Sequence, residues 1–287
     1  MSRHTSWRIG GPARRYYEPR DIDDLVAFLR DLPPGEPLFW LGLGSNLLVR
    51  DGGVEGTVIS TFRALAGLGE AGEHRVRAEA GVACPQVARF CSQRGLCGAE
   101  FLAGIPGTMG GALAMNAGAF GGETWQLVER VETVDRQGTL RVRSPEEYEI
   151  GYRSVRGPEG EWFVAAVLAL SPGDSAAASA RIRDLLERRK ATQPLNQPSC
   201  GSVFRNPVGD HAARLIESAG LKGLREGGAC VSEKHANFIV NLGGASAADV
   251  ERLIRRVAEQ VEAVHGVRLV PEVRIVGVPA GEREEAR

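Results

Sequence analysis

A serine in the last third of the chain has neighbours that suit acid–base chemistry. Ser202 follows Gly201 and stands close to Arg205 and Asn206. A serine in such a setting can donate a proton or take part in an anion-binding clamp. Phe204 occupies the place of the second glycine in the G-x-S-x-G elbow of hydrolases, so that arrangement is excluded. An isolated serine in a turn more often bonds its own backbone, and this simpler interpretation stays open.

Two further ionisable residues stand in settings that need an explanation. Arg153 follows Tyr152 after a predicted turn, where an arginine is by default a solvated surface charge. Glu272 lies among the apolar residues of a predicted strand, so it is either exposed at the edge of a sheet or buried because it has a functional role. His235 has no second histidine or cysteine at ligand spacing, and we expect it to be structural. The sequence therefore predicts no metal site.

The segment 42–47 is rich in glycine and joins two predicted strands. A dinucleotide-binding fingerprint would need a third glycine and a helix directly after it, but a strand begins at Leu47. The chain also lacks the G-x-x-x-x-G-K-[ST] motif of P-loops. The backbone N–H groups of this segment can form an anion-binding nest, or the segment can be an ordinary tight turn. Taken alone, it favours neither alternative.

A second glycine-rich segment gives a stronger signal. Seven of the nineteen residues from Gly104 to Gly122 are glycine, and charge is almost absent. Surface loops of this length are normally polar. Small side chains leave room for a large flat ligand with a diphosphate, whereas a tight crossing of backbones would not explain why two such segments exist. Together the two segments favour a bulky dinucleotide cofactor.

Hydrophobic periodicity predicts the elements that must carry these residues. Asp21 is expected to cap a helix that ends at Pro33, and Ser246 and Asp249 are expected to form the capping box of the last helix. The expected helices cover residues 22–32, 85–93, 175–191, 210–219 and 246–265. The expected strands cover residues 38–41, 47–49, 58–60, 75–80, 127–134, 139–143, 162–170, 236–241 and 267–276. The last third of the chain therefore has the pattern of a mixed α/β layer.

Length and composition indicate a globular chain in water. The 287 residues suggest two domains, and residues 171–178 have the composition of a linker between them. The formal net charge of −1 argues against a nucleic-acid or anionic-membrane partner. No apolar run is long enough to span a bilayer, and the first residues lack the apolar stretch of a secretory signal. The five cysteines form no C-x-x-C pair, so we expect neither disulfides nor zinc, and a cytoplasmic location.

Nine segments of the chain, in this order, resemble the family of UDP-N-acetylenolpyruvoylglucosamine reductases, also called UDP-N-acetylmuramate dehydrogenases. Each segment alone would be a weak signal, but nine in the same order from one end of the chain to the other are highly specific. The segments are TSWRIGGPA (5–13), GLGSNLL (42–48), AGIPGTMGG (103–111), MNAGAFG (115–121), GYR (151–153), GSVFRNP (201–207), AGLKG (219–223), VSEKHANFI (231–239) and PEVR (271–274).

The resemblance implies an α+β fold, with a two-lobed FAD-binding module of the vanillyl-alcohol-oxidase type followed by a smaller α/β substrate-binding domain. The FAD-binding domain would cover residues 1–174, with lobes of about 1–60 and 61–174, and the substrate domain would cover residues 175–287. The resemblance also implies that NADPH reduces non-covalently bound FAD. Flavin N5 would then deliver a hydride to C3 of the enolpyruvyl ether of UDP-N-acetylglucosamine enolpyruvate, giving UDP-N-acetylmuramate for peptidoglycan synthesis. We expect a monomer whose partners are this substrate and NADPH, with no nucleic acid and no membrane insertion.

The resemblance assigns roles to individual residues. Ser202 would donate the proton to C2, Arg153 would hold the substrate carboxylate, and Glu272 would be the third catalytic residue. We expect Glu272 to be protonated, because its apolar strand and the substrate carboxylate would both raise its pKa. The expected substrate contacts are Tyr152, Arg205 and Asn206. The residues expected to hold FAD are Gly42, Gly44, Ser45, Asn46, Leu47, Gly104, Pro106, Gly107, Thr108, Gly110, Gly111, Asn116, Ala117 and Gly118.

The chain departs from the family pattern in two places. Ser154 directly follows Arg153, whereas relatives have a serine one position later, where this chain has Val155. The stretch between Arg153 and Ser202 leaves no room for the tyrosine-bearing insertion of the longer members, so we expect the short form.

Two other functions compete with the reductase. An FAD oxidase of the same superfamily, acting on a hydroxy acid or a sugar alcohol, would lack the trio Ser202, Arg153 and Glu272 and would not need NADPH. A nucleotide-binding module without turnover would have no reason to keep the three together.

Overall fold

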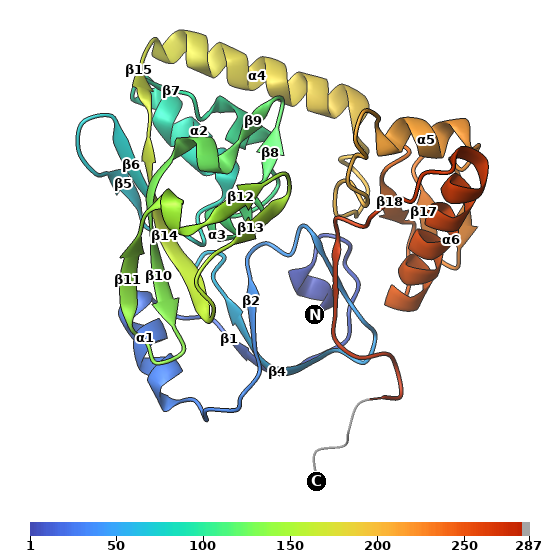
Figure 1. The fold of residues 1–287 in the computed structure, drawn as a ribbon, viewed down its shortest axis with the longest axis horizontal. Helices are drawn as coiled ribbons and strands as arrows, with labels where there is room; N and C mark the ends of the chain where they lie inside the picture. Colours follow the sequence, from blue (N-terminus) through green and yellow to red (C-terminus); the bar gives the residue numbers. More distant parts are fainter. Residues whose placement is uncertain (283–287) are drawn as a thin grey trace. The chain divides into compact units, whose positions relative to one another are not determined.

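The computed structural model describes residues 1–282 and groups the chain into two compact units (Figure 1). The first unit consists of Met1–Arg15, Gly44–Gly56 and Lys190–Arg287, and the second of Tyr16–Leu43 and Thr57–Arg189. The sequence from Gly281 onward is rich in charged residues, and residues 283–287 lie outside the described part of the chain. The first unit therefore combines residues from the beginning of the chain with residues of its last third. The boundary expected at residue 174, between an FAD-binding and a substrate-binding domain, stays a prediction.

The second unit is built on a five-stranded antiparallel sheet in the order β11-β10-β14-β6-β5. Its central strand β14 is apolar along most of its length, and its residues 164–168 are buried. In a smaller sheet, β2 pairs in parallel with residues 57–60 of β4, which belong to this unit. The strands that lie wholly or partly in this unit are β1 (Ala13–Tyr17), β2 (Leu38–Leu41), β4 (Val54–Ser60), β5 (Leu68–Glu70), β6 (Arg75–Glu79), β7 (Leu96–Cys97), β8 (Gly118–Ala119), β9 (Gly122–Glu123), β10 (Val128–Asp135), β11 (Leu140–Arg143), β12 (Glu149–Gly151), β13 (Ser154–Arg156), β14 (Glu161–Ala169) and β15 (Ser171–Pro172).

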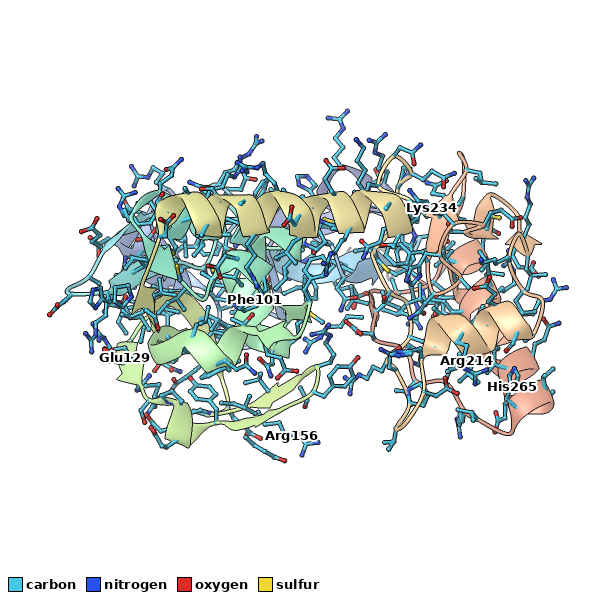
Figure 2. The ribbon with its side chains drawn as sticks, turned by 90° about the horizontal axis from the view of Figure 1, so that it is seen from above. Phe101, Glu129, Arg156, Arg214, Lys234 and His265 are labelled. Carbon is cyan, nitrogen blue, oxygen red and sulfur yellow. The ribbon has the colours of Figure 1, made fainter. Side chains whose placement is uncertain are left out.

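Helices cover the sheets of the second unit and close its core. The helices are α1 (Ile22–Asp31), α2 (Cys84–Gln93), α3 (Met109–Met115) and α4 (Ser175–Thr192), with short 3-10 turns η2 (Glu100–Gly104), η3 (Thr124–Leu127) and η4 (Pro145–Glu147). The α1 prediction is confirmed, because the side chain of Asp21 accepts a hydrogen bond from the backbone N–H of Asp24. One hydrophobic cluster packs α2 and α3 against β6 and β14, and a second packs α1 against β4 and β10. Phe101, which belongs to the first cluster, lies beside α4 (Figure 2).

The first unit is organised around the long helix α6 (Ala247–His265). The predicted capping box of Ser246 and Asp249 is present, and Gly266 ends the helix in the left-handed conformation with φ 66°. Strand β19 pairs in parallel with β3, which brings the C-terminal segment beside the first glycine-rich segment. The other elements are η1 (Ser2–His4), β3 (Leu47–Val49), α5 (Ala212–Ser218), β16 (Arg225–Glu226), β17 (Ala229–Val231), β18 (Ile239–Asn241) and β19 (Arg274–Val276).

Two expectations about secondary structure are wrong. The segment 104–122 is not a continuous loop, because residues 109–115 form α3. Periodicity could not reveal this helix, since glycine and alanine dominate it and the helix is only two turns long. The strand expected over 267–276 is limited to residues 274–276, and the backbone before it bonds to another irregular segment. None of the described helices is long and apolar enough to cross a membrane.

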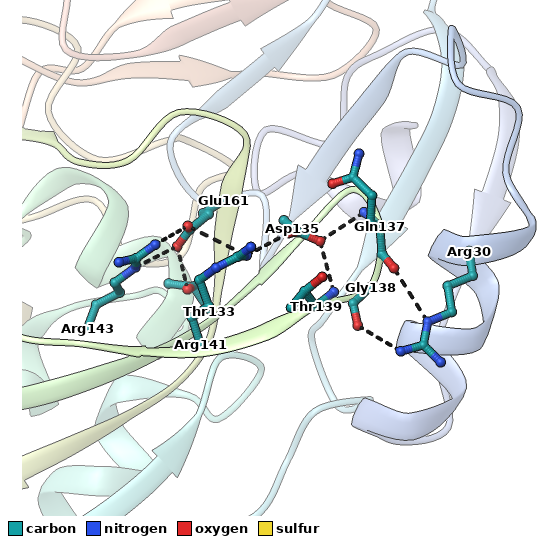
Figure 3. A network of polar contacts seen from close by, with 9 residues as sticks. All are labelled: Arg30, Thr133, Asp135, Gln137, Gly138, Thr139, Arg141, Arg143 and Glu161. Atoms are coloured by element: carbon teal, nitrogen blue, oxygen red, sulfur yellow. Dashed lines mark hydrogen bonds and ion pairs between the residues drawn. The ribbon is translucent and has the colours of Figure 1, made fainter.

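Ion pairs and hydrogen bonds compensate the negative charge of a largely buried carboxylate at the start of β14. Glu161 accepts hydrogen bonds from Arg143 Nη2 at 2.6 Å and from Thr133 Oγ1 at 2.7 Å (Figure 3). Arg141 lies between Glu161, at 3.8 Å, and Asp135, at 2.6 Å. The Arg143 guanidinium holds the pKa of Glu161 below its usual range. The carboxylate therefore stays ionised although its side chain is only 7% exposed.

Replacing this carboxylate tests its contribution to stability. We expect Glu161→Gln to lower the free energy of unfolding at pH 7 by about 1–3 kcal/mol, because charge-assisted bonds to Arg143 are lost. The folded-state pKa is lowered, so the wild-type advantage is complete above the unfolded-state value of about 4.3 and is lost as the pH falls through the folded-state value. Urea unfolding at pH 7 and at pH 3 measures both effects.

A matched control uses the exposed pair of Arg156 and Glu149, whose side chains are 79% and 78% exposed. Glu149→Gln should change the unfolding free energy by less than about 0.5 kcal/mol. A loss in Glu161→Gln that is the same at both pH values would contradict the electrostatic explanation.

Candidate active site

Two of the predicted catalytic residues lie on backbone segments that pair with each other in the first unit. Phe204 and Pro271 form an isolated antiparallel bridge. The backbone N–H of Glu272 donates to the carbonyl oxygen of Val203 at 2.7 Å. Because of this pairing, Ser202 and Glu272 belong to adjacent stretches of chain, and both residues are half-buried. Here the structure brings together two backbone segments whose candidate catalytic residues are 70 positions apart in sequence.

A buried asparagine that the sequence analysis did not single out holds the serine segment in place. Asn237 accepts from the backbone N–H of Phe204 at 3.0 Å and donates to its carbonyl oxygen at 2.8 Å. The side chain of Asn237 therefore replaces the ladder partner that a strand would have supplied. Its sequence signal was its place between the apolar residues Ala236 and Phe238, where a polar side chain must find partners.

The first glycine-rich segment, from Gly44 onward, is bonded to the glutamate segment. Asn46 Nδ2 donates to the carbonyl oxygen of Glu272 at 3.1 Å, and the N–H of Arg274 donates to the carbonyl oxygen of Asn46 at 3.1 Å. Gly44 has a φ of 67°, and a Cβ atom there would lie 2.1 Å from the carbonyl oxygen of His4. Only glycine fits this turn. The segment is thus fixed to the backbone that carries Glu272.

Arg153 lies in the second unit at the two-residue turn between β12 and β13. Its φ of 52° is in the left-handed region, which costs an arginine roughly 1–2 kcal/mol. Its guanidinium donates to the carbonyl oxygens of Asn116, at 3.3 Å, and Gly118, at 2.8 Å. Arg156 on the same hairpin instead extends into solvent (Figure 2). Arg153 is therefore not a solvated surface charge but an oriented cation in a strained turn.

Asn116 connects the segments around Arg153. It ends α3 with φ 45° and ψ 55°, and it is 1% exposed. Its Oδ1 accepts from the N–H of Trp125 at 3.1 Å, while Nδ2 donates to the carbonyl oxygen of Gly151 at 3.2 Å and to Glu123 Oε2 at 2.9 Å. Asn116 was expected among the FAD-binding residues, but its amide bonds within the protein. It fixes the start of the turn that carries Arg153.

The three expected substrate contacts differ in their surroundings. Tyr152 is 48% exposed, and its ring lies 5.2 Å from the Arg153 guanidinium carbon. Arg205 is half-buried, beside the bridge to Pro271. Asn206 Oδ1 accepts from the N–H of Ala212 at the start of α5, so this oxygen has a structural partner. Their contacts with substrate stay predictions.

Several glycines of the second segment are required by packing inside the protein. A Cβ atom at Gly110 would lie 2.9 Å from the Cβ of Ala80, and one at Gly118 would lie 2.5 Å from the carbonyl oxygen of Gly122. Close crossing of backbones, the alternative to ligand binding, therefore explains part of the glycine content. Gly111 is different, because it is exposed and a Cβ atom there would meet nothing closer than 3.7 Å.

The second unit also contains a cavity of about 240 Å³ that fits part of the expected FAD. Gly42, Gly110 and Gly111, all expected FAD-binding residues, contribute to its wall. The hydroxyl of Thr108 would lie 2.4 Å from a Cβ at Gly42, and it is buried without a partner among the described residues. Buried polar groups without a protein partner indicate a missing ligand or water. The residues present are thus compatible with FAD.

The described residues contain no group of histidines, cysteines and carboxylates that could hold a metal ion. All five cysteines are free. His235 packs edge-on against Phe238, with ring centroids 4.6 Å apart, and burial lowers its pKa. It is therefore neutral near pH 7, as a packed core histidine would be.

Comparison with known proteins places both parts of the chain in one kind of enzyme. Residues 193–276 match the family described as UDP-N-acetylenolpyruvoylglucosamine reductase, C-terminal domain, and residues 13–143 match the family described as FAD binding domain. The UDP-N-acetylenolpyruvoylglucosamine reductase of Alkalilimnicola ehrlichii is 67% identical over 277 residues, covering 96% of this chain and 93% of that protein. The same enzyme of Methylococcus capsulatus is 66% identical, covering 96% and 91%. The crystal structure of UDP-N-acetylenolpyruvylglucosamine reductase from Thermus caldophilus aligns with a TM-score of 0.83 at 35% identity, covering 96% and 97%.

Two variants of Asn116 separate its side-chain bonds from its left-handed backbone. Asn116→Gly keeps an easily left-handed residue but loses the three side-chain bonds, and we expect it to lower the unfolding free energy by about 1–3 kcal/mol. Asn116→Asp sets a carboxylate against Glu123 and against the carbonyl of Gly151, so its loss should be larger than that of the glycine variant. Thermal unfolding of the two variants measures this difference at pH 7. An aspartate variant as stable as wild type would contradict the assigned bonding.

Proposed function

The chain belongs to the family of UDP-N-acetylenolpyruvoylglucosamine reductases, and we propose that it reduces the enolpyruvyl ether of UDP-N-acetylglucosamine enolpyruvate to UDP-N-acetylmuramate, with NADPH as the hydride donor. It is an FAD-containing oxidoreductase of peptidoglycan precursor synthesis. The observation that supports the detailed proposal best is the backbone pairing of the Ser202 and Glu272 segments, with Asn46 bonded to the latter. Both proposed reactants, NADPH and a UDP-sugar, are cytoplasmic metabolites, so we propose a cytoplasmic location.

Arg153 would bind the carboxylate of the enolpyruvyl group. When bound, FAD supplies the hydride for C3 of this group, and negative charge then develops on C2 and the attached carboxylate. A planar guanidinium suits a carboxylate because it can donate two parallel hydrogen bonds. The bonds from Arg153 to the carbonyls of Asn116 and Gly118 orient the guanidinium before substrate arrives. A cation oriented in advance stabilises developing charge without a reorganisation cost during the reaction.

Ser202 would donate a proton to C2. A serine hydroxyl is a weak acid in water, so the high basicity of the developing carbanion must drive the transfer. The position of the hydroxyl therefore matters more than its pKa. Asn237 and the bridge to Pro271 fix the backbone directly after Ser202, which limits the positions that the hydroxyl can reach.

Glu272 would act as a neutral carboxylic acid. An ionised carboxylate beside the substrate carboxylate would be repelled, whereas a protonated one donates a hydrogen bond. Two hydrogen bonds hold the backbone of Glu272. The N–H of Glu272 donates to the carbonyl oxygen of Val203, and the carbonyl oxygen of Glu272 accepts from Asn46 Nδ2. The backbone position from which the Glu272 side chain extends is therefore fixed.

The role of Ser202 predicts that one half-reaction fails and the other persists. In Ser202→Ala, reduction of the flavin by NADPH should keep its wild-type rate, because no proton at C2 is involved. Reoxidation by the enolpyruvyl substrate should slow by about 10²- to 10⁴-fold, the usual contribution of a positioned general acid. Anaerobic stopped-flow absorbance measures the two steps separately. Equal rates of reoxidation in the variant and the wild type would rule out Ser202 as the proton donor.

The role of Glu272 predicts a difference in pH dependence. A carboxylic acid that must stay protonated loses function as the pH rises through its pKa, so the wild-type kcat should fall on the alkaline side. Glu272→Gln keeps a neutral hydrogen-bond donor, so it should retain activity and lack that alkaline fall. Steady-state rates of both proteins between pH 6 and pH 10 provide the test. A glutamine variant that is inactive at every pH would contradict the donor role.

A further inference from the structure

Two short hairpins of the second unit are bonded to each other beside Arg153. In the first hairpin β8 pairs with β9, so that Gly118 lies opposite Glu123, and in the second β12 pairs with β13 on either side of the Arg153 turn. The guanidinium of Arg153 donates to the carbonyl oxygen of Gly118 at 2.8 Å. Asn116, just before β8, donates in turn to the carbonyl oxygen of Gly151 at the end of β12. Hydrogen bonds therefore connect the two hairpins in both directions.

The carboxylate of Glu123 receives two hydrogen bonds at the end of the first hairpin. Its Oε2 accepts from Asn116 Nδ2 at 2.9 Å, and the side chain also accepts from the backbone N–H of Gln126 in the capping box of η3. Bonds to a charged acceptor are stronger than bonds between neutral groups. A glutamine at position 123 would keep the length of the side chain but would remove the charge and add an NH₂ group, which can only donate.

Glu123 and Arg153 are neighbours on the same side of Gly118. A Cβ atom at Gly118 would lie 3.1 Å from Glu123 Cγ and 3.2 Å from Arg153 Nη1. Asn116 bonds to both side chains, because its Nδ2 donates to Glu123 and its backbone carbonyl oxygen accepts from Arg153 Nη1 at 3.3 Å. A displacement of Asn116 would therefore also displace an acceptor of the guanidinium.

Strained backbone makes this segment dependent on its contacts. Asn116 and Phe120 have φ angles of 45° and 53°, and Arg153 has a φ of 52°. Residues other than glycine keep this left-handed conformation only where surrounding contacts hold them. The bond from Asn116 to Glu123 is such a contact, because it ties the residue before the first hairpin to the residue that ends it.

We propose that Glu123 is a positioning residue for Arg153: through Asn116, its carboxylate holds the guanidinium in the orientation that binds the substrate carboxylate. The proposal rests on the role of Arg153 in the proposed function and adds a residue that the resemblance did not assign. A carboxylate that acted only through its charge would repel the substrate carboxylate, so its removal would strengthen binding. Removal of a positioning carboxylate weakens binding instead, because the guanidinium loses its orientation. The sign of the effect therefore distinguishes the two roles.

Two ligands that differ in one carboxylate test the proposal without turnover. UDP-N-acetylmuramate carries the carboxylate on its lactyl ether, whereas UDP-N-acetylglucosamine has the same nucleotide and sugar without that group. Calorimetry measures the affinity of the FAD-loaded wild type and of Glu123→Gln for each ligand. We expect the variant to raise the dissociation constant of UDP-N-acetylmuramate about three- to tenfold, the effect of about one hydrogen bond. The dissociation constant of UDP-N-acetylglucosamine should stay unchanged, which would also show that the variant is folded.

A matched control and a double variant make the result specific. Glu129 is another half-buried carboxylate of this unit, but it bonds to Arg75 and Arg130, so Glu129→Gln should change neither affinity. Arg153→Ala removes the group through which Glu123 acts. Adding Glu123→Gln to Arg153→Ala should therefore cause no further loss of affinity for UDP-N-acetylmuramate.

Three results would overturn the proposal. They are an affinity of Glu123→Gln for UDP-N-acetylmuramate that rises or stays the same, an equal loss of affinity for both ligands, and an undiminished effect of Glu123→Gln when Arg153 is absent. With Arg153→Ala weakening UDP-N-acetylmuramate, any of these results leaves the proposed reductase function standing. An Arg153→Ala variant that binds UDP-N-acetylmuramate as well as wild type would contradict the proposed role of Arg153, and the role of Glu123 with it.

Discussion

Hydrogen bonds from asparagine side chains to irregular backbone are the interaction on which the candidate site depends. Asn46 donates to the backbone carbonyl oxygen of Glu272. Asn237 bonds to both the backbone N–H and the carbonyl oxygen of Phe204. Asn116 donates to the carbonyl oxygen of Gly151, directly before the turn that carries Arg153. An amide carries a donor and an acceptor, so it can satisfy peptide groups that no strand or helix pairs. Each of the three proposed catalytic residues therefore belongs to a backbone segment that is held by hydrogen bonds from an asparagine side chain.

This dependence explains how much of the molecule could be predicted from its sequence. The helices α1 and α6 were predictable, because their caps and apolar periodicity are local signals. The short helix α3 was not, because alanine and glycine carry no periodic pattern. The resemblance to a family supplied Ser202, Arg153 and Glu272, but the role of Asn237 depends on contacts between distant segments. Such contacts leave no trace in the spacing of residues.

The glycine content of the second glycine-rich segment has two physical causes. Gly110 and Gly118 are required where backbone or side chains of the protein itself approach closely. Gly111 borders the cavity and has open space beside it. Around the same segment, Asn116, Phe120 and Arg153 all have positive φ angles, between 45° and 53°. Strained backbone of this kind persists only where surrounding contacts hold it, and its concentration here agrees with a binding function.

The visible spectrum of the purified protein under anaerobic conditions tests the proposed reductase function most directly. NADPH is added first, and UDP-N-acetylglucosamine enolpyruvate is added after the spectrum is stable. We expect a flavin band that NADPH bleaches and that returns only with the enolpyruvyl substrate. A bound flavin that NADPH does not bleach would contradict the reductase assignment and favour an oxidase. A protein that shows no flavin, even after reconstitution with FAD, would contradict the cofactor site itself.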